Sequence, residues 1–230
     1  MRVIVVSHHG IDEAGFIAGA FAARGAEIDV HLFPADGPLP ALDGVDHVVV
    51  LGAVWSVYDR AAIGHWIEDE LAWLRRADQA GVPVLGICFG AQALCAALGG
   101  QVVPAPRQEV GWTMVEPLAP DLIDPGPWLE FHGDQCLPPA DARVLARNDV
   151  CVQAFVLRAN LAVQFHPEVD GPQLARWLDG ESREAARRAG RDPEELIAQT
   201  VAEEPAAAAR AGRLVAAALR LADEARSARI

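Results

Sequence analysis

The stretch VPVLGICFGAQ, residues 82–92, joins a short apolar run to a sharp turn around Cys88. The run Val82–Ile87 is typical of a buried strand, and the residues that follow favour a helix over Ala91–Leu98. Glycines two positions before and two positions after the cysteine leave room for a tight, strained turn that exposes its side chain. The pattern therefore predicts a strand-to-helix unit with a cysteine at its corner.

The sequence before this stretch repeats the same alternation of strand and helix. Apolar, β-branched runs predict strands at Arg2–Ser7, Ile28–Phe33 and Asp46–Leu51, and helical spacing predicts helices over Asp12–Arg24 and Asp59–Ala80. Apolar strands that alternate with helices form parallel sheets covered on both faces. The expected fold class is α/β, with a doubly wound, mostly parallel sheet.

The helix signal fades after residue 100 and returns near residue 170. Short β-like pieces between turn residues predict antiparallel additions to the sheet at Trp112–Glu116, Trp128–His132, Arg143–Ala146, Cys151–Leu157 and Leu161–Phe165. Prolines near helix starts predict a helical C-terminal tail with helices at Pro172–Leu178, Pro193–Ala202 and Pro205–Ala225.

This change of character divides the expected chain into two parts. Residues 1–170 form a catalytic domain, and residues 171–230 form a helical extension. The last helix is rich in alanine and leucine, and its apolar stripe must be buried. It packs either on the domain or on a partner protein, which leaves a homo-oligomer open.

Charge and composition exclude several classes of protein. The chain carries 19 basic and 32 acidic residues, a formal net charge of −13, which argues against binding nucleic acid or an anionic membrane. No run of eighteen apolar residues predicts a membrane span, and the N-terminus lacks a signal peptide. Four cysteines without CxxC spacing indicate reduced thiols in a cytoplasmic protein, with no structural metal and no cofactor.

Three segments at the ends of predicted strands contain candidate catalytic residues. Because ligands bind at the carboxyl ends of strands in open α/β sheets, we expect these segments to share one site. Cys88 is the candidate nucleophile, His166 in QFHPE is the candidate base, and Glu168 can orient its imidazole. Backbone N–H groups of Gly52, Ala53 and Phe89 are the candidate oxyanion hole.

The paired motifs resemble the class I (triad-type) glutamine amidotransferase family. GICFGAQ and QFHPE, whose cysteine and histidine lie 78 residues apart, carry the resemblance over roughly Val3–Val169, and GWT at Gly111–Thr113 and FHGDQ at Phe131–Gln135 also look like family signatures. The SVYD and HGD pieces are most similar to the glutaminase component of GMP synthases.

The resemblance implies a fold, a reaction and further site residues. It implies a flavodoxin-like sheet and hydrolysis of the glutamine side-chain amide through a cysteinyl γ-glutamyl thioester, with ammonia passed to a separate acceptor enzyme. It also implies that Gln92 contacts the substrate, and that His132, Gly133 and Asp134 receive its amino and carboxylate ends.

The oxyanion loop departs from the family pattern. Relatives carry Gly-Gly-Pro where this chain reads Gly52-Ala53-Val54. If the second position requires a positive φ, Ala53 costs roughly 1 kcal/mol, and the loop of the free protein would be shaped differently. Activity would then be low until a partner or substrate organises the loop.

Two other functions remain open at this stage. A stand-alone hydrolase of γ-glutamyl peptides or amines would use the same three residues and the same thioester. A binding or redox-sensing module would use only Cys88, at the strand-to-helix turn. The pairing of His166 with Glu168 argues against this function, because a sensor needs neither residue. His8 and His9 end the first strand and could line the site, and Trp55 could cover it.

Overall fold

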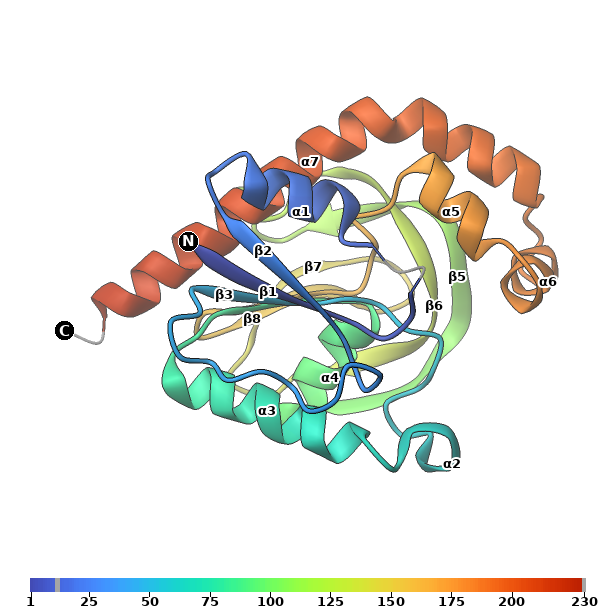
Figure 1. The fold of residues 1–230 in the computed structure, drawn as a ribbon. Helices are drawn as coiled ribbons and strands as arrows, with labels where there is room; N and C mark the ends of the chain where they lie inside the picture. The colour runs from blue at the N-terminus through green and yellow to red at the C-terminus, as the bar shows by residue number, and fades with distance from the viewer. Residues whose placement is uncertain (11–12, 229–230) are drawn as a thin grey trace.

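The computed structural model describes residues 1–10 and 13–228. Within them, one nine-stranded sheet has the order β2-β1-β3-β4-β9-β8-β7-β5-β6 (Figure 1). The parallel half consists of β2 (Glu27–Leu32), β1 (Arg2–Ser7), β3 (His47–Val50), β4 (Val84–Ile87) and β9 (Asn160–Val163). The carboxyl ends of these strands therefore lie at one edge, where the predicted site residues follow β3, β4 and β9.

The other half of the sheet is antiparallel. It consists of β8 (Val152–Leu157), β7 (Arg143–Arg147), β5 (Gln101–Pro117) and β6 (Gly126–Leu137). β9 joins the halves because it pairs parallel with β4 and antiparallel with β8. Four pairings are parallel and four are antiparallel, so the α/β class with a parallel core and antiparallel additions is confirmed.

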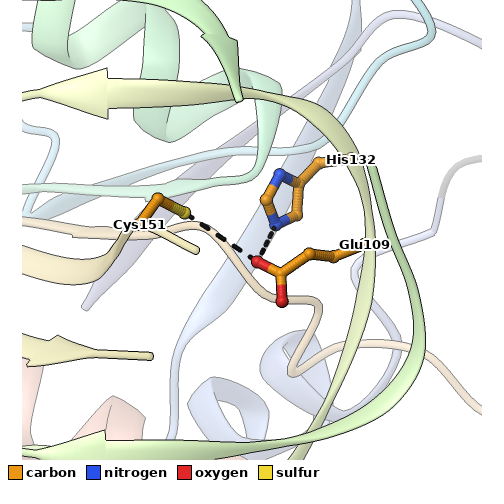
Figure 2. Close-up of side chains that lie close together, drawn as sticks. All are labelled: Glu109, His132 and Cys151. Carbon is orange, nitrogen blue, oxygen red and sulfur yellow. Dashed lines mark hydrogen bonds and ion pairs between the residues drawn. The ribbon is translucent and has the colours of Figure 1, made fainter. Parts of the chain in front are cut away.

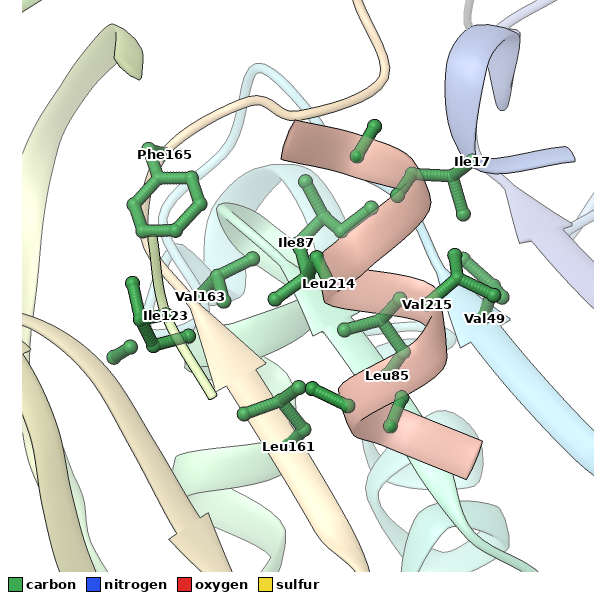
Figure 3. Packing of buried hydrophobic residues seen from close by; sticks show 14 of the residues in the cluster. Ile17, Val49, Leu85, Ile87, Ile123, Leu161, Val163, Phe165, Leu214 and Val215 are labelled. Carbon is green, nitrogen blue, oxygen red and sulfur yellow. The ribbon is translucent and has the colours of Figure 1, made fainter. Parts of the chain in front are cut away.

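Helices cover both faces of the parallel half. α1 (Gly15–Ala22) and α7 (Pro193–Ser227) lie on one face, and α3 (Ile67–Ala80) and α4 (Phe89–Ala97) lie on the other (Figure 1). Side chains alternate along each strand, so Leu85 packs towards α7 while the residue before it packs towards α3. Figure 3 shows the α7 face, where Leu214 and Val215 meet the strand residues Val49, Leu85, Ile87, Leu161 and Val163.

A third apolar cluster anchors α5 (Gly171–Trp177) and α6 (Glu181–Arg188) to the β5–β6 ribbon. It buries Val110 and Leu129 of the ribbon against Leu174 of α5 and Ala186 of α6. Figure 1 shows β5 and β6 curving around the side of the molecule that faces these helices. The ribbon is thus held beside the carboxyl edge of the sheet.

The predicted helix Asp59–Ala80 is interrupted. The structure has a short α2 (Arg60–Ile63), then a break, then α3. Trp66 leaves helical geometry with a φ of −139°, and its ring packs against Phe33 and Phe89. This tertiary packing, which helical periodicity does not encode, explains the break.

The last two of the three predicted tail helices form one helix in the structure. α7 runs through Pro205, which lacks the N–H that would bond to the carbonyl four residues earlier. Such a proline costs about 3 kcal/mol in a helix interior. Buried residues on both sides, Leu196 and Thr200 before it and Leu214 and Val215 after it, stabilise the continuous helix. Figure 1 shows α7 curving across the α1 face.

β5 is longer than the predicted Trp112–Glu116. Its first part carries Pro104 and Pro106, which hide a strand pattern, and the register shifts between Pro104 and Glu109. In the described part of the chain, no helix is both long enough and apolar enough to cross a membrane.

Candidate active site

The sharp turn between β4 (Val84–Ile87) and α4 (Phe89–Ala97), called the elbow below, holds Cys88 in a strained conformation. Its φ is 50° and its ψ is −107°, a backbone conformation that residues other than glycine rarely adopt. The Cys88 N–H donates to the Val163 carbonyl at 2.9 Å. A Cβ on Gly86 would lie 2.6 Å from the Gly90 carbonyl oxygen, and one on Gly90 would lie 2.1 Å from that of Val50. Both glycines are therefore required, as the sequence pattern predicts.

Cys88, His166 and Gly52 meet at one point. A Cβ on Gly52 would lie 2.9 Å from His166 Cε1 and 3.6 Å from Cys88 Cβ. The main chain of β6 forms a wall beside this point, because the His166 N–H donates to the Leu129 carbonyl at 2.8 Å and Cys88 Sγ lies 4.0 Å from the Phe131 carbonyl oxygen. The loop after β3, the elbow and the segment after β9 thus form one site.

Glu168 orients the imidazole of His166. The His166 Nδ1 lies 2.8 Å from Glu168 Oε1, and both side chains are buried. Burial alone would lower the pKa of His166, but the charges of Glu168 and Cys88 outweigh it and raise the pKa well above its usual range. His166 Nε2 has no hydrogen-bond partner among the described residues. The arrangement therefore favours the protonated, positively charged form of the His166 imidazole.

The predicted oxyanion loop, residues 52–54, has no residue with a positive φ at its second position. Neither Gly52 nor Ala53 has a positive φ, so the expected cost of alanine does not arise and that reason for a misshapen loop is removed. Glycine is needed at position 52 because of its contact with His166. Phe89 is buried in the first turn of α4, where backbone N–H groups lack intrahelical partners.

The aromatic side chains around this loop pack on one another. The Trp55 ring stacks on His9 with centroids 4.5 Å apart, and its edge meets Trp66 at 5.7 Å. His8 is buried, pairs with Glu70 at 3.0 Å, and packs against the Phe89 ring at 5.0 Å. These contacts connect the oxyanion loop to the elbow.

The predicted substrate-binding side chains are engaged within the protein. The Gln92 amide donates to Gln164 at 3.3 Å, and His132 Nδ1 donates to the backbone carbonyl of Asp134 at 2.8 Å. The Asp134 carboxylate accepts hydrogen bonds from Ser56 at 2.5 Å and Tyr58 at 2.6 Å. A Cβ on Gly133, between them, would meet no atom within 4 Å. Their assignment to the substrate stays a prediction.

The sequence reasoning missed two buried acids beside the site. Glu109 on β5 and Glu130 on β6 lie within 3.3 and 3.2 Å of His132 Nε2. Glu109 faces His132 directly across the β5–β6 ladder, and Glu130 precedes His132 by two residues on the same strand face. Knowledge of which residues pair across β5 and β6 would have revealed this cluster.

Glu109 and His132 also lie near Cys151, as Figure 2 shows. One potential ligand atom from each lies within 4.8 Å of the others, and these are residue types that bind Zn²⁺. However, the Gln153 amide donates both to Glu109 Oε2 at 2.9 Å and to Cys151 Sγ at 3.3 Å. Burial raises the pKa of the Cys151 thiol, which favours its neutral form. The contacts fit a hydrogen-bonded ion cluster better than a metal centre.

The fold and the elbow define an α/β protein with a cysteine at the carboxyl edge of its sheet. Residues 15–178 match the model of the family "Glutamine amidotransferase class-I". The chain belongs to the class I glutamine amidotransferase family, and the predicted resemblance is confirmed.

Relatives narrow this placement to homologues of GMP synthase glutaminases. The chain is 35% identical to the glutamine-hydrolysing GMP synthase of Thermomicrobium roseum over 178 residues, which cover 72% of this chain and 31% of that protein. It is 32% identical to one subunit of the glutamine-hydrolysing GMP synthase of Thermoplasma volcanium over 165 residues, which cover 66% of this chain and 76% of that polypeptide. The chain thus spans about a third of the longer relative and three quarters of the shorter one.

Solved structures support the fold. A glutamine amidotransferase from Thermotoga maritima superposes with a TM-score of 0.85 at 24% identity, covering 96% of this chain and 98% of that one. One from Methylobacillus flagellatus superposes with a TM-score of 0.86 at 23% identity, covering 96% and 94%.

Proposed function

We propose that the chain is a glutaminase that releases ammonia from the side-chain amide of glutamine. The single observation that carries the proposal is the convergence of Cys88, His166 and Gly52 at one point, with Glu168 hydrogen-bonded to the far nitrogen of the imidazole. This is the arrangement that a cysteine nucleophile, its base and an orienting acceptor require.

In the first half-reaction, the Cys88 thiolate attacks the amide carbon. The carbonyl electron pair moves onto oxygen, where backbone N–H groups of the oxyanion loop and Phe89 stabilise the negative charge. The His166 imidazolium gives its proton to the amide nitrogen, and the carbon–nitrogen bond breaks. Ammonia leaves, and a γ-glutamyl thioester remains on Cys88.

In the second half-reaction, water attacks the thioester carbon and gives a proton to the neutral imidazole of His166. The carbon–sulfur bond then breaks, glutamate leaves, and the thiolate–imidazolium pair is restored. Glu168 stabilises the imidazolium at the start and the end of the cycle, because its carboxylate raises the pKa of His166.

A separate synthetase protein is the proposed acceptor of the ammonia. Relatives from two Thermoplasma species are each named as one subunit of a GMP synthase, which implies a second polypeptide in those enzymes. We infer the same division of labour here.

The test is ammonia release from glutamine by the chain, alone and with a candidate synthetase. We expect release that Cys88→Ala and His166→Asn abolish. Release that survives Cys88→Ala would contradict the proposal. Rapid cleavage of a γ-glutamyl anilide with no hydrolysis of glutamine would favour the γ-glutamyl hydrolase instead.

A further inference from the structure

A buried cluster of three ionisable side chains lies beside the proposed catalytic pair. His132 Nε2 lies 3.3 Å from Glu109 Oε2 and 3.2 Å from Glu130 Oε2, and the three side chains are at most 3% exposed. Figure 2 shows the His132 ring pointing at the Glu109 carboxylate. Burying such charges is costly unless they are paired, so their presence together in the interior calls for a physical explanation.

The cluster connects several strands. Glu109 comes from β5, and Glu130 and His132 come from β6. Glu109 also accepts hydrogen bonds from Asn148 at 2.7 Å and Gln153 at 2.9 Å, which lie at the end of β7 and within β8. It therefore fixes the β5–β6 ribbon to the remainder of the sheet.

The same piece of β6 forms the wall of the catalytic site. Leu129 and Phe131 alternate with Glu130 and His132 along the strand. The Leu129 carbonyl accepts a hydrogen bond from the backbone N–H of His166, and the Phe131 carbonyl lies against the sulfur of Cys88. A shift of the buried cluster would therefore move groups that touch both proposed catalytic residues.

Charge also connects the cluster to the catalytic pair. Burial lowers the pKa of His132, but Glu109 and Glu130, with the charge of Cys88, raise it to about 10. His132 is therefore a cation at neutral pH, and its attraction to a Cys88 thiolate is mutual. Burial raises the pKa of Glu130 to about 7, although His132 and His166 oppose the rise.

We propose that Glu109, His132 and Glu130 are positioning residues that hold the β6 wall in place and keep Cys88 reactive. The inference rests on the proposed function in taking Cys88 as the nucleophile. His132 then acts from within the protein, through its charge and its strand.

The test measures alkylation of Cys88 by iodoacetamide as a function of pH, with peptide mass spectrometry to locate the adduct. This reaction needs no substrate, so it separates failure of this inference from failure of the glutaminase proposal. The ionisable groups that face the cluster are Cys88 on the elbow, His166 after β9 and Cys151 before β8. Glu168 acts on the same pair through His166.

Glu109→Gln keeps the shape of the side chain and removes its charge. We expect Cys88 alkylation at pH 7 to slow by about tenfold, because the loss of the Glu109 carboxylate lowers the pKa of His132 and removes the anionic acceptor that ties the β5–β6 ribbon to Gln153 of β8. Glu116→Gln is the matched control on the same strand, because Glu116 is exposed and pairs only loosely with Arg147 at 3.6 Å. It should alkylate like the wild type.

His132→Gln removes the positive charge itself, so alkylation should slow as well and the midpoint of its pH profile should move upward. Glu130→Gln is the second variant, since Glu130 is already partly protonated at neutral pH and its amide should be accommodated. It should remove the change in rate near pH 7 that we expect the titration of Glu130 to give the wild-type profile. Wild-type rates and profiles in folded Glu109→Gln and Glu130→Gln proteins would overturn the inference and leave the cluster a purely structural one.

Discussion

Substituting Gly52 by alanine tests how closely the site is assembled. The new Cβ would lie 2.9 Å from His166 Cε1, whereas carbon atoms in contact are about 3.5 to 4.0 Å apart. His166 must therefore move by roughly 0.5 to 1 Å. It cannot move freely, because its backbone N–H is hydrogen-bonded to Leu129 and its Nδ1 to Glu168. Its ring also packs against the Trp177 ring, with centroids 4.9 Å apart.

A displacement of this size should reduce activity far more than stability. Misplacing a catalytic group by up to 1 Å costs about 10- to 100-fold in rate, or about 1.4 to 2.7 kcal/mol of transition-state stabilisation. Alanine suits the backbone, since the φ of Gly52 is not positive. We expect kcat/KM for glutamine to fall by that factor while Tm changes by only a few degrees.

Gly19→Ala is the matched control. Gly19 lies in α1, and a Cβ there would meet no atom within 4 Å. Activity should match the wild type, and Tm should stay the same or rise, because alanine favours helices by about 1 kcal/mol over glycine. Wild-type kcat/KM in Gly52→Ala would refute the described approach of Gly52 to His166.

Three further substitutions probe the site and its surroundings. Glu168→Gln should lower kcat by at least about 100-fold. It should also shift the pH profile of kcat to lower pH, because Glu168 raises the pKa of His166. Steady-state kinetics measured across a range of pH check both effects. Ala53→Gly should change kcat by less than about threefold, since the φ of Ala53 is not positive and glycine relieves no strain; a large gain would contradict this. The folded state raises the pKa of the Glu130 carboxyl from 4.5 to about 7, so its stabilising contribution is present below pH 4.5 and is lost as the pH rises through 7. At about 1.4 kcal/mol per pH unit the loss is about 3 kcal/mol, and urea unfolding at pH 5 and pH 8 should show a smaller pH dependence in Glu130→Gln than in the wild type.

The parallel core could be predicted because each strand is a short apolar run that ends in a recognisable turn. Val84–Ile87 and the glycine-flanked Cys88 are the clearest case, since hard steric limits dictate the elbow. His166 and Glu168 follow a neighbouring strand, and the rule that ligands bind at carboxyl edges was enough to bring them together.

The remaining features depend on contacts that local sequence does not encode. The Glu109–His132 pair arises from the register of the β5–β6 ladder, which is hidden by Pro104 and a register shift. Pro205 continues a helix because packing on both sides outweighs its local cost. In each case tertiary structure overrides the local preference.

Labelling with a diazo-ketone analogue of glutamine tests the central claim most directly, because the reagent reacts only where a γ-glutamyl pocket holds an activated thiolate. Intact and peptide mass spectra should show one adduct, on Cys88, that excess glutamine suppresses and that His166→Asn slows at least about tenfold. An unmodified Cys88, or an adduct on Cys95, Cys136 or Cys151 in its place, would contradict the account.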